Sequence, residues 1–103
     1  MRDRPLRAAV ARVWQGRTRA AIADECMAYM YEHGIRKIRA TPGNLGVQVW
    51  RRIEGDVAHF ATVSYWGSRA NIAAYAGADI EKPRHLPRDA EYLLELPERV
   101  QHF

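Results

Sequence analysis

Tyr29, His33 and Tyr75 are the first side chains that could do chemistry, because they stand in two stretches with helical spacing of apolar residues. An imidazole titrates near neutral pH, so His33 is a candidate general base. We expect the three side chains to meet between two helices and a sheet, with Tyr29 and Tyr75 as candidate substrate-binding residues. In the alternative interpretation the tyrosines pack as core, and His33 sits at a helix end where the helix dipole favours a cation.

Two further candidates lie outside these stretches. His85 stands between Pro83 and Pro87, and loops carry site residues disproportionately, so His85 is a second candidate base. Its alternative is a surface position without function. Arg51 shares strand parity with Val47 and Val49 and could point inward to stabilise negative charge, although a surface salt bridge is its ordinary role.

Several kinds of site are not expected. A lone Cys26 can form neither an internal disulfide nor a multi-cysteine zinc site, and no two histidines have metal-ligand spacing, so we predict no metal. Ser68 lacks the surroundings of a nucleophile elbow and is better explained as a helix N-cap. Gly43 and Gly46 lack the extended glycine pattern of a dinucleotide loop and predict a turn or bulge.

Composition narrows the class of protein. The 103 residues are 48% hydrophobic and 27% charged, as in an ordinary globular domain. Residues 1–39 hold nine basic and four acidic side chains, and residues 40–103 hold seven and eight, so the net charge of +4 is concentrated near the beginning. Because no basic stripe follows, we expect no nucleic-acid partner. No apolar run suits a membrane span or a signal peptide, so we expect no membrane partner and a cytoplasmic location.

The elements that must position these residues alternate between strand and helix patterns. Residues 7–15 have the two-residue period of a strand, which Gly16 ends, and Thr18 then caps a helix that Gly34 terminates. From residue 36 we expect a strand, a turn over residues 41–46 and a strand to Ile53. The tight turn at residues 54–56 joins this strand to residues 57–66.

A second helix and a last strand complete the pattern. Ser68 caps a helix that ends near Gly77, and Tyr92, Leu94 and Leu96 form a strand that Pro97 bends before residues 100–103. The order is that of an α+β, ferredoxin-like βαββαβ domain with an antiparallel sheet, spanning residues 1–103. Two helices cover only one face of such a sheet. Residues 57–66 are apolar on both faces, so we expect a homodimer, sheet against sheet, with an interface of roughly 2,000 Å² or more.

Three segments carry a resemblance to a known family: residues 39–52, residues 64–69 with the following helix, and residues 92–96 with the closing residues 99–102. Together they resemble the antibiotic biosynthesis monooxygenases, which are homodimeric α/β barrels. The resemblance implies that Trp66 lies at a pocket mouth and donates its indole N–H to a substrate oxygen or to dioxygen. The alternative is a core tryptophan whose N–H is satisfied within the protein.

The resemblance implies a cofactor-independent monooxygenase that oxidises a small aromatic or polyphenolic substrate with dioxygen. Such an enzyme needs a base, an anion stabiliser and a dry pocket, for which we expect His33 or His85, then Trp66 with an arginine. Family members that act on polyketide quinones place an amide near the tryptophan, and Asn71 is the nearby candidate. Haem-degrading members have an asparagine on the first strand and a histidine on the second helix, so Arg12 and the histidine-free helix argue against haem.

A non-enzymatic barrel that binds a small ligand, or has a structural role, is the alternative function. A pocket without titratable groups would favour it. An enzyme should show a cavity with convergent polar groups and at least one histidine with a perturbed pKa.

Overall fold

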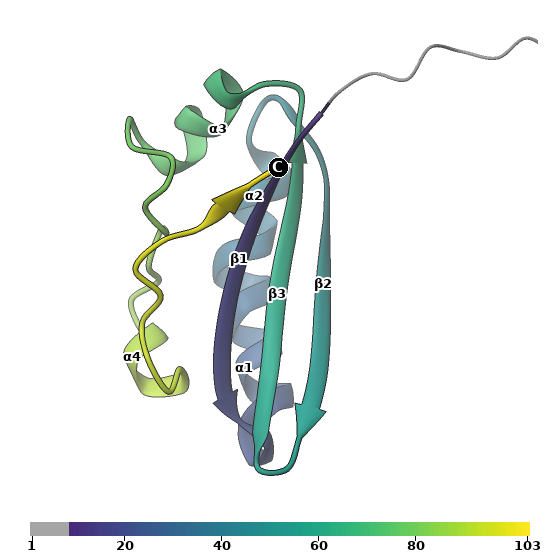
Figure 1. Ribbon diagram of the computed structural model, residues 1–103, viewed down its shortest axis with the longest axis vertical. Helices are drawn as coiled ribbons and strands as arrows, with labels where there is room; N and C mark the ends of the chain where they lie inside the picture. The colour runs from purple at the N-terminus through teal and green to yellow at the C-terminus, as the bar shows by residue number, and fades with distance from the viewer. Residues whose placement is uncertain (1–8) are drawn as a thin grey trace, which may run out of the picture.

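A four-stranded antiparallel sheet organises the computed structural model, which describes residues 9–103. Its strands lie in the order β2-β3-β1-β4 (Figure 1). Their bounds are β1 (Val10–Arg19), β2 (Asn44–Glu54), β3 (Val57–Trp66) and β4 (Gln101–His102). All three pairings are antiparallel, and the tight turn between β2 and β3 has Gly55 at φ 58°. The expected α+β, ferredoxin-like arrangement with its hairpin is therefore confirmed.

The helices cover one face of this sheet and one of its edges. A continuous helical segment runs behind the sheet in Figure 1, and α3 and α4 lie to the side of β1. In chain order the helical elements are the 3₁₀ turn η1 (Ala20–Ile22), α1 (Ala23–Met30), the π-helical η2 (Tyr31–Ile35), α2 (Arg36–Ala40), α3 (Arg69–Ala76) and α4 (Asp89–Tyr92). Among the described residues no helix is long and apolar enough to cross a membrane.

The core lies between the sheet and the helices in two clusters. Ala58 and Phe60 of β3 pack against Cys26, Tyr29 and Met30 of α1. The second cluster lies nearer α3 and contains Ile38, Trp66 and Ile72. Burial of these apolar side chains fixes the register of β3, since a slip of one residue would turn its buried side chains to the opposite face.

The first strand is longer than the sequence pattern predicts, and the expected break at Gly16 is wrong. Pairing with β3 continues to Arg19, which lies opposite Val57. Gly16 serves another purpose: a Cβ there would lie 2.4 Å from the Trp14 ring. Thr18 is not a helix cap, because its hydroxyl donates to the carbonyl of Tyr92. Residues 7 and 8 of the predicted strand lie outside the described residues.

The first helical segment passes through Gly34 instead of ending there, so the predicted strand at residues 36–40 is also wrong. Ile35 and Ile38 are 6% and 7% exposed, and their burial favours continuing the helix despite the glycine. The segment ends at Thr41, which is extended, as expected of a residue before proline. The turn and bulge that follow agree with the prediction, since the register shifts between Asn44 and Gly46.

The second helix begins and ends as predicted, with Ser68 as N-cap and Gly77 at φ 90°. The last strand differs from the prediction. Residues 89–92 form α4, only Leu93 bridges to Thr18, and regular pairing resumes at β4 beside Arg12 and Val13. Pro97 has no N–H to donate, which is consistent with the ladder breaking between these two contacts.

Candidate functional site

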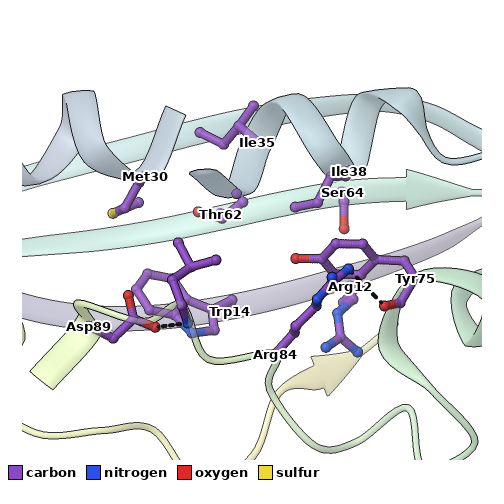
Figure 2. Close-up of a pocket in the computed structure, with 12 residues that line it drawn as sticks. Arg12, Trp14, Met30, Ile35, Ile38, Thr62, Ser64, Tyr75, Arg84 and Asp89 are labelled. Carbon is purple, nitrogen blue, oxygen red and sulfur yellow. Dashed lines mark hydrogen bonds between the residues drawn. The ribbon is translucent and has the colours of Figure 1, made fainter. Parts of the chain in front are cut away.

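A pocket lies between the helix-covered face of the sheet and the chain that joins α3 to α4 (Figure 2). Its walls combine aromatic and apolar side chains with several polar ones. They are Arg12, Trp14, Met30, Gly34, Ile35, Ile38, Thr62, Ser64, Tyr75, Arg84, Leu86 and Asp89. The space inside is about 60 Å³, well below the roughly 300 to 1,000 Å³ of sites for drug-sized ligands. In this conformation the pocket can take a small ligand or one end of a larger one.

Arg12 supplies a buried cation to this pocket. The residue is 4% exposed, and its Nη2 donates to the carbonyl of Lys82 at 3.0 Å while Nη1 donates to the carbonyl of Ile80. Nη1 also lies 3.4 Å from Nε2 of His102 on the neighbouring strand β4. Burial lowers the Arg12 pKa, and the neighbouring Tyr75 opposes the shift. A guanidinium stays protonated in proteins, so the charge is present at neutral pH.

Asp89 supplies a buried carboxylate at another part of the wall. It is 6% exposed, and its Oδ2 accepts a hydrogen bond from the Leu86 N–H at 2.8 Å. Burial raises the Asp89 pKa, against the opposing effects of the Leu86 N–H and of His85. In Figure 2, Trp14 lies between Asp89 and Arg12, so an aromatic wall separates the two ionisable groups.

Tyr75 brings a phenol to the Arg12 side of the pocket. Burial raises its pKa, and Arg84 and Arg12 act in the opposite direction. The Arg84 guanidinium lies over the Tyr75 ring, with Cζ 5.0 Å from the ring centroid, and its Nη1 donates to the Tyr75 carbonyl. Two cations therefore lie close to one neutral phenol, a setting that stabilises negative charge on a bound molecule.

Trp66 is fully buried and is not among the pocket-lining residues. Its Nε1 donates to Oγ of Ser64 at 2.9 Å, and Ser64 does line the pocket. The Trp66 ring lies 6.3 Å from the Tyr75 ring, centroid to centroid. Trp66 thus reaches the pocket only through its neighbours, because Ser64 already accepts the indole N–H.

The predicted bases lie at the surface instead of lining the pocket. His33 is exposed on η2, and its ring lies 4.8 Å from that of Tyr29. Tyr29 is buried, and its hydroxyl accepts the Arg88 N–H at 2.7 Å. It therefore holds in place the residue that precedes α4. His85 is also exposed, yet its Nδ1 lies 4.0 Å from Oδ2 of Asp89 and so adjoins the pocket wall from outside.

The other two predicted contacts are elsewhere. Arg51 faces the helix side of the sheet, as its parity implies, but its Nη1 pairs with Oδ1 of Asp24 at 2.6 Å. Asn71 packs on the Gly43 turn, where an added Cβ would meet its side chain at 2.6 Å, and its N–H donates to Ser68. Of the predicted residues, the structure therefore brings only Tyr75 to the pocket surface. His85 and Trp66 lie behind it, each next to a residue that lines the pocket, Asp89 and Ser64 respectively.

Arg12, Arg84 and Asp89 are the charged site residues that sequence reasoning missed. A signal existed for Arg12, because it occupies the same strand parity as Val10 and Trp14, where an apolar side chain is expected. For Arg84 and Asp89 the sequence offers no comparable signal, since their segment was expected to precede a strand. Within residues 9–103 no three acidic, histidine or cysteine side chains come together in a way that could hold a metal ion.

Comparison with known proteins supports the same architecture. A solved structure of a protein from Nitrosomonas europaea, proposed to be an antibiotic biosynthesis monooxygenase, matches with a TM-score of 0.63 over 92% of this chain and 86% of that chain. The fold is antibiotic biosynthesis monooxygenase-like. Sequence identity is 17%, so the likeness concerns the fold alone. No family model and no curated protein matches the sequence.

Proposed function

We propose that the chain is a cofactor-independent monooxygenase that oxidises a small aromatic or polyphenolic substrate with dioxygen in this pocket. The observation that carries the proposal is the convergence of Arg12, Tyr75, Arg84 and Asp89 around an aromatic wall. Titratable groups at the edge of an apolar pocket are typical of an active site. The monooxygenase-like fold supports the same class of reaction.

The substrate supplies every electron in the proposed reaction. An activated CH₂ group loses a proton to a base, and the resulting carbanion gives one electron to dioxygen. The two radicals combine to form a C–O bond, and the peroxide anion takes up a proton. Loss of water then leaves a carbonyl group, so one oxygen atom enters the product and the other leaves as water.

Asp89 is the base that the geometry favours, since burial raises its pKa and makes it a stronger base than an exposed carboxylate. His85, 4.0 Å away and exposed, can pass the proton to solvent. Arg12 and Arg84 stabilise the substrate anion, and Tyr75 lies beside them. Trp66 is a positioning residue, because it holds the Ser64 hydroxyl.

Oxygen uptake by metal-stripped protein tests the proposal, with anthrones as substrates because they carry the activated CH₂ group that the reaction requires. We expect uptake above the buffer rate and a fall of about 10²-fold or more in Asp89→Asn, the usual scale of a general base. Glu91→Gln is the matched control, because it removes an exposed carboxylate from the same short helix. It should keep full activity.

The remaining variants separate the candidate bases. Loss of uptake in His33→Ala with full activity in Asp89→Asn would make His33 the base and contradict the role of Asp89. His85→Ala should slow turnover most at low buffer concentration, where added buffer cannot replace it as proton carrier. Trp66→Phe and Ser64→Ala should lower kcat by the same factor, and the double variant no further, if Trp66 acts through Ser64. Activity that requires added metal would contradict the cofactor-independent reaction.

A non-enzymatic ligand-binding protein is the second candidate, and the size of the pocket favours it. A space of about 60 Å³ leaves little room for a polyphenol and dioxygen together. Saturable binding of a small aromatic ligand without oxygen uptake, by protein shown to be folded, would support this function over oxidation.

We also propose that two copies form a homodimer, sheet against sheet. The face of the sheet turned toward the viewer in Figure 1 has no helix over it. It carries Trp50, which is 59% exposed, beside the half-buried Ala61 directly opposite it on β3. The pocket lies on the helix side, so dimerisation through this face would leave its lining residues accessible.

A further inference from the structure

The charge of Arg12 has no counter-ion within the described part of the chain. Ion pairs with N to O distances up to 4.0 Å involve eight pairs of described groups, and Arg12 belongs to none of them. His102, whose Nε2 lies 3.4 Å from Nη1, has a pKa lowered by burial and by Arg12 itself, so it offers a neutral acceptor at neutral pH. A buried cation without an opposite charge is costly for a folded protein.

The guanidinium also has unused donors. The carbonyls of Ile80 and Lys82 accept from Nη1 and Nη2, and the planar guanidinium carries more N–H groups than these acceptors and His102 can satisfy. Arg12 lines the pocket, so a ligand there can approach the remaining donors. Planar donor pairs of this kind bind carboxylates with bidentate geometry.

The side chains around Arg12 also favour a negatively charged ligand at this side of the pocket. Arg84 adds a second positive charge beside Tyr75, whose burial-raised pKa keeps the phenol neutral. Asp89 is the acidic member of the lining, and Figure 2 places it beyond Trp14. The pocket is therefore positive at the Arg12 side and acidic at the Asp89 side, with an aromatic surface between them.

We infer that the pocket binds a small organic acid, whose carboxylate pairs with Arg12 while its ring lies against Trp14 and its reactive end points toward Asp89. This inference deepens the proposed function by naming the substrate class, and it rests on that function only for the reactive end. A carboxylate supplies the missing counter-ion, and a small acid, or one acidic end of a larger molecule, suits the small volume of the pocket. In the structural alternative, Arg12 only fastens the turn before Pro83 to β1 through the two carbonyls.

Two probes that differ by one carboxylate test the inference: 2,5-dihydroxybenzoate and hydroquinone. Binding is measured under nitrogen by calorimetry or tryptophan fluorescence, so that no oxidation occurs. We expect wild-type protein to bind the carboxylate probe at least about tenfold more tightly, the ratio that corresponds to about 1.4 kcal/mol. Arg12→Met should abolish the preference, and Arg12→Lys should keep part of it, since the charge remains but the planar fork is lost.

Arg99→Met is the matched control, because Arg99 is an exposed arginine that pairs with Asp79 and Glu81. It should keep the preference, whereas an effect of the overall positive charge would lower it in both methionine variants. Equal affinity of wild-type protein for the two probes overturns the inference even if Arg12→Met does not fold. A carboxylate preference that survives in folded Arg12→Met overturns it as well.

The same experiment separates this inference from the proposed oxidation. Binding of the carboxylate probe through Arg12 without oxygen uptake on any substrate would contradict the monooxygenase and support the anion site. Oxygen uptake with equal binding of both probes would contradict the anion site and support the monooxygenase.

Discussion

Asp89 shows how a single buried side chain links stability to chemistry. The carboxyl group lies in the pocket wall, accepts the Leu86 N–H and has an exposed histidine beyond it. Burial disfavours the charged form, so the folded protein holds this proton to higher pH than the unfolded chain does. The property that would make Asp89 a useful base therefore carries a cost in stability.

The raised pKa of Asp89 predicts how the stability of the protein changes with pH. Between the ordinary pKa of 3.8 and the raised value in the folded protein, the folded state binds more protons than the unfolded state. The free energy of unfolding should therefore fall as pH rises through this range, relative to Asp89→Asn, which has no such proton. Urea titrations of both proteins at several pH values above about 4 measure the difference. Parallel pH profiles for the two proteins would show that Asp89 has no raised pKa.

At the level of the element, β1 matters most for the site because it carries both Arg12 and Trp14 into the pocket. The strand continues through Gly16, and the missing side chain at this position leaves room for the Trp14 ring. Sequence alone suggests a strand end at this glycine. Gly16 instead allows the Trp14 ring, which lines the pocket, to pack over the backbone of its own strand.

Gly16→Ala should therefore destabilise the protein and move the Trp14 ring. The added Cβ would lie 2.4 Å from the ring, and overpacking of this kind costs about 1 to 3 kcal/mol. Urea denaturation measures the loss, and near-ultraviolet circular dichroism reports on the ring. Gly46→Ala is the matched control, because a Cβ at this strand glycine meets nothing within 4 Å. Equal small effects of the two substitutions would show that Trp14 does not depend on Gly16.

At the scale of the whole molecule, the sheet has two unlike faces. The helix-covered face contains the core clusters and the pocket, whereas the opposite face exposes Trp50. Tryptophan is enriched at protein interfaces, so its exposure on a sheet face without a covering layer supports an interaction surface there. The proposed homodimer would bury this face and leave the pocket in each copy intact.

Trp50→Glu should convert a dimer into a monomer. The new charge would lie in the interface and repel its symmetry mate, as in an isologous contact. Light scattering after gel filtration measures the mass over a range of protein concentrations. Tyr31→Ser serves as the control, because Tyr31 is 44% exposed on the helix layer, and it should leave the mass unchanged. A wild-type monomer at all concentrations would contradict the dimer.

The sequence determined the elements whose signals are local. The hairpin at residues 54–56 depends on a glycine at φ 58°, and α3 depends on the Ser68 cap, which accepts the Asn71 N–H. These interactions lie within a few residues of one another, so residue type and spacing contain the information. Together with the strand pattern they were sufficient to give the α+β, ferredoxin-like order.

Only the tertiary structure decided that the helix continues through Gly34, where the last strand pairs and which polar residues share a pocket. Burial of Ile35 and Ile38 outweighs the weak helix propensity of one glycine. Arg12 and Asp89 lie far apart in the sequence and are brought to one pocket by β1 and by the chain that follows α3. Their burial and their altered pKa values arise from contacts across the fold, and such contacts leave no periodic trace in the sequence.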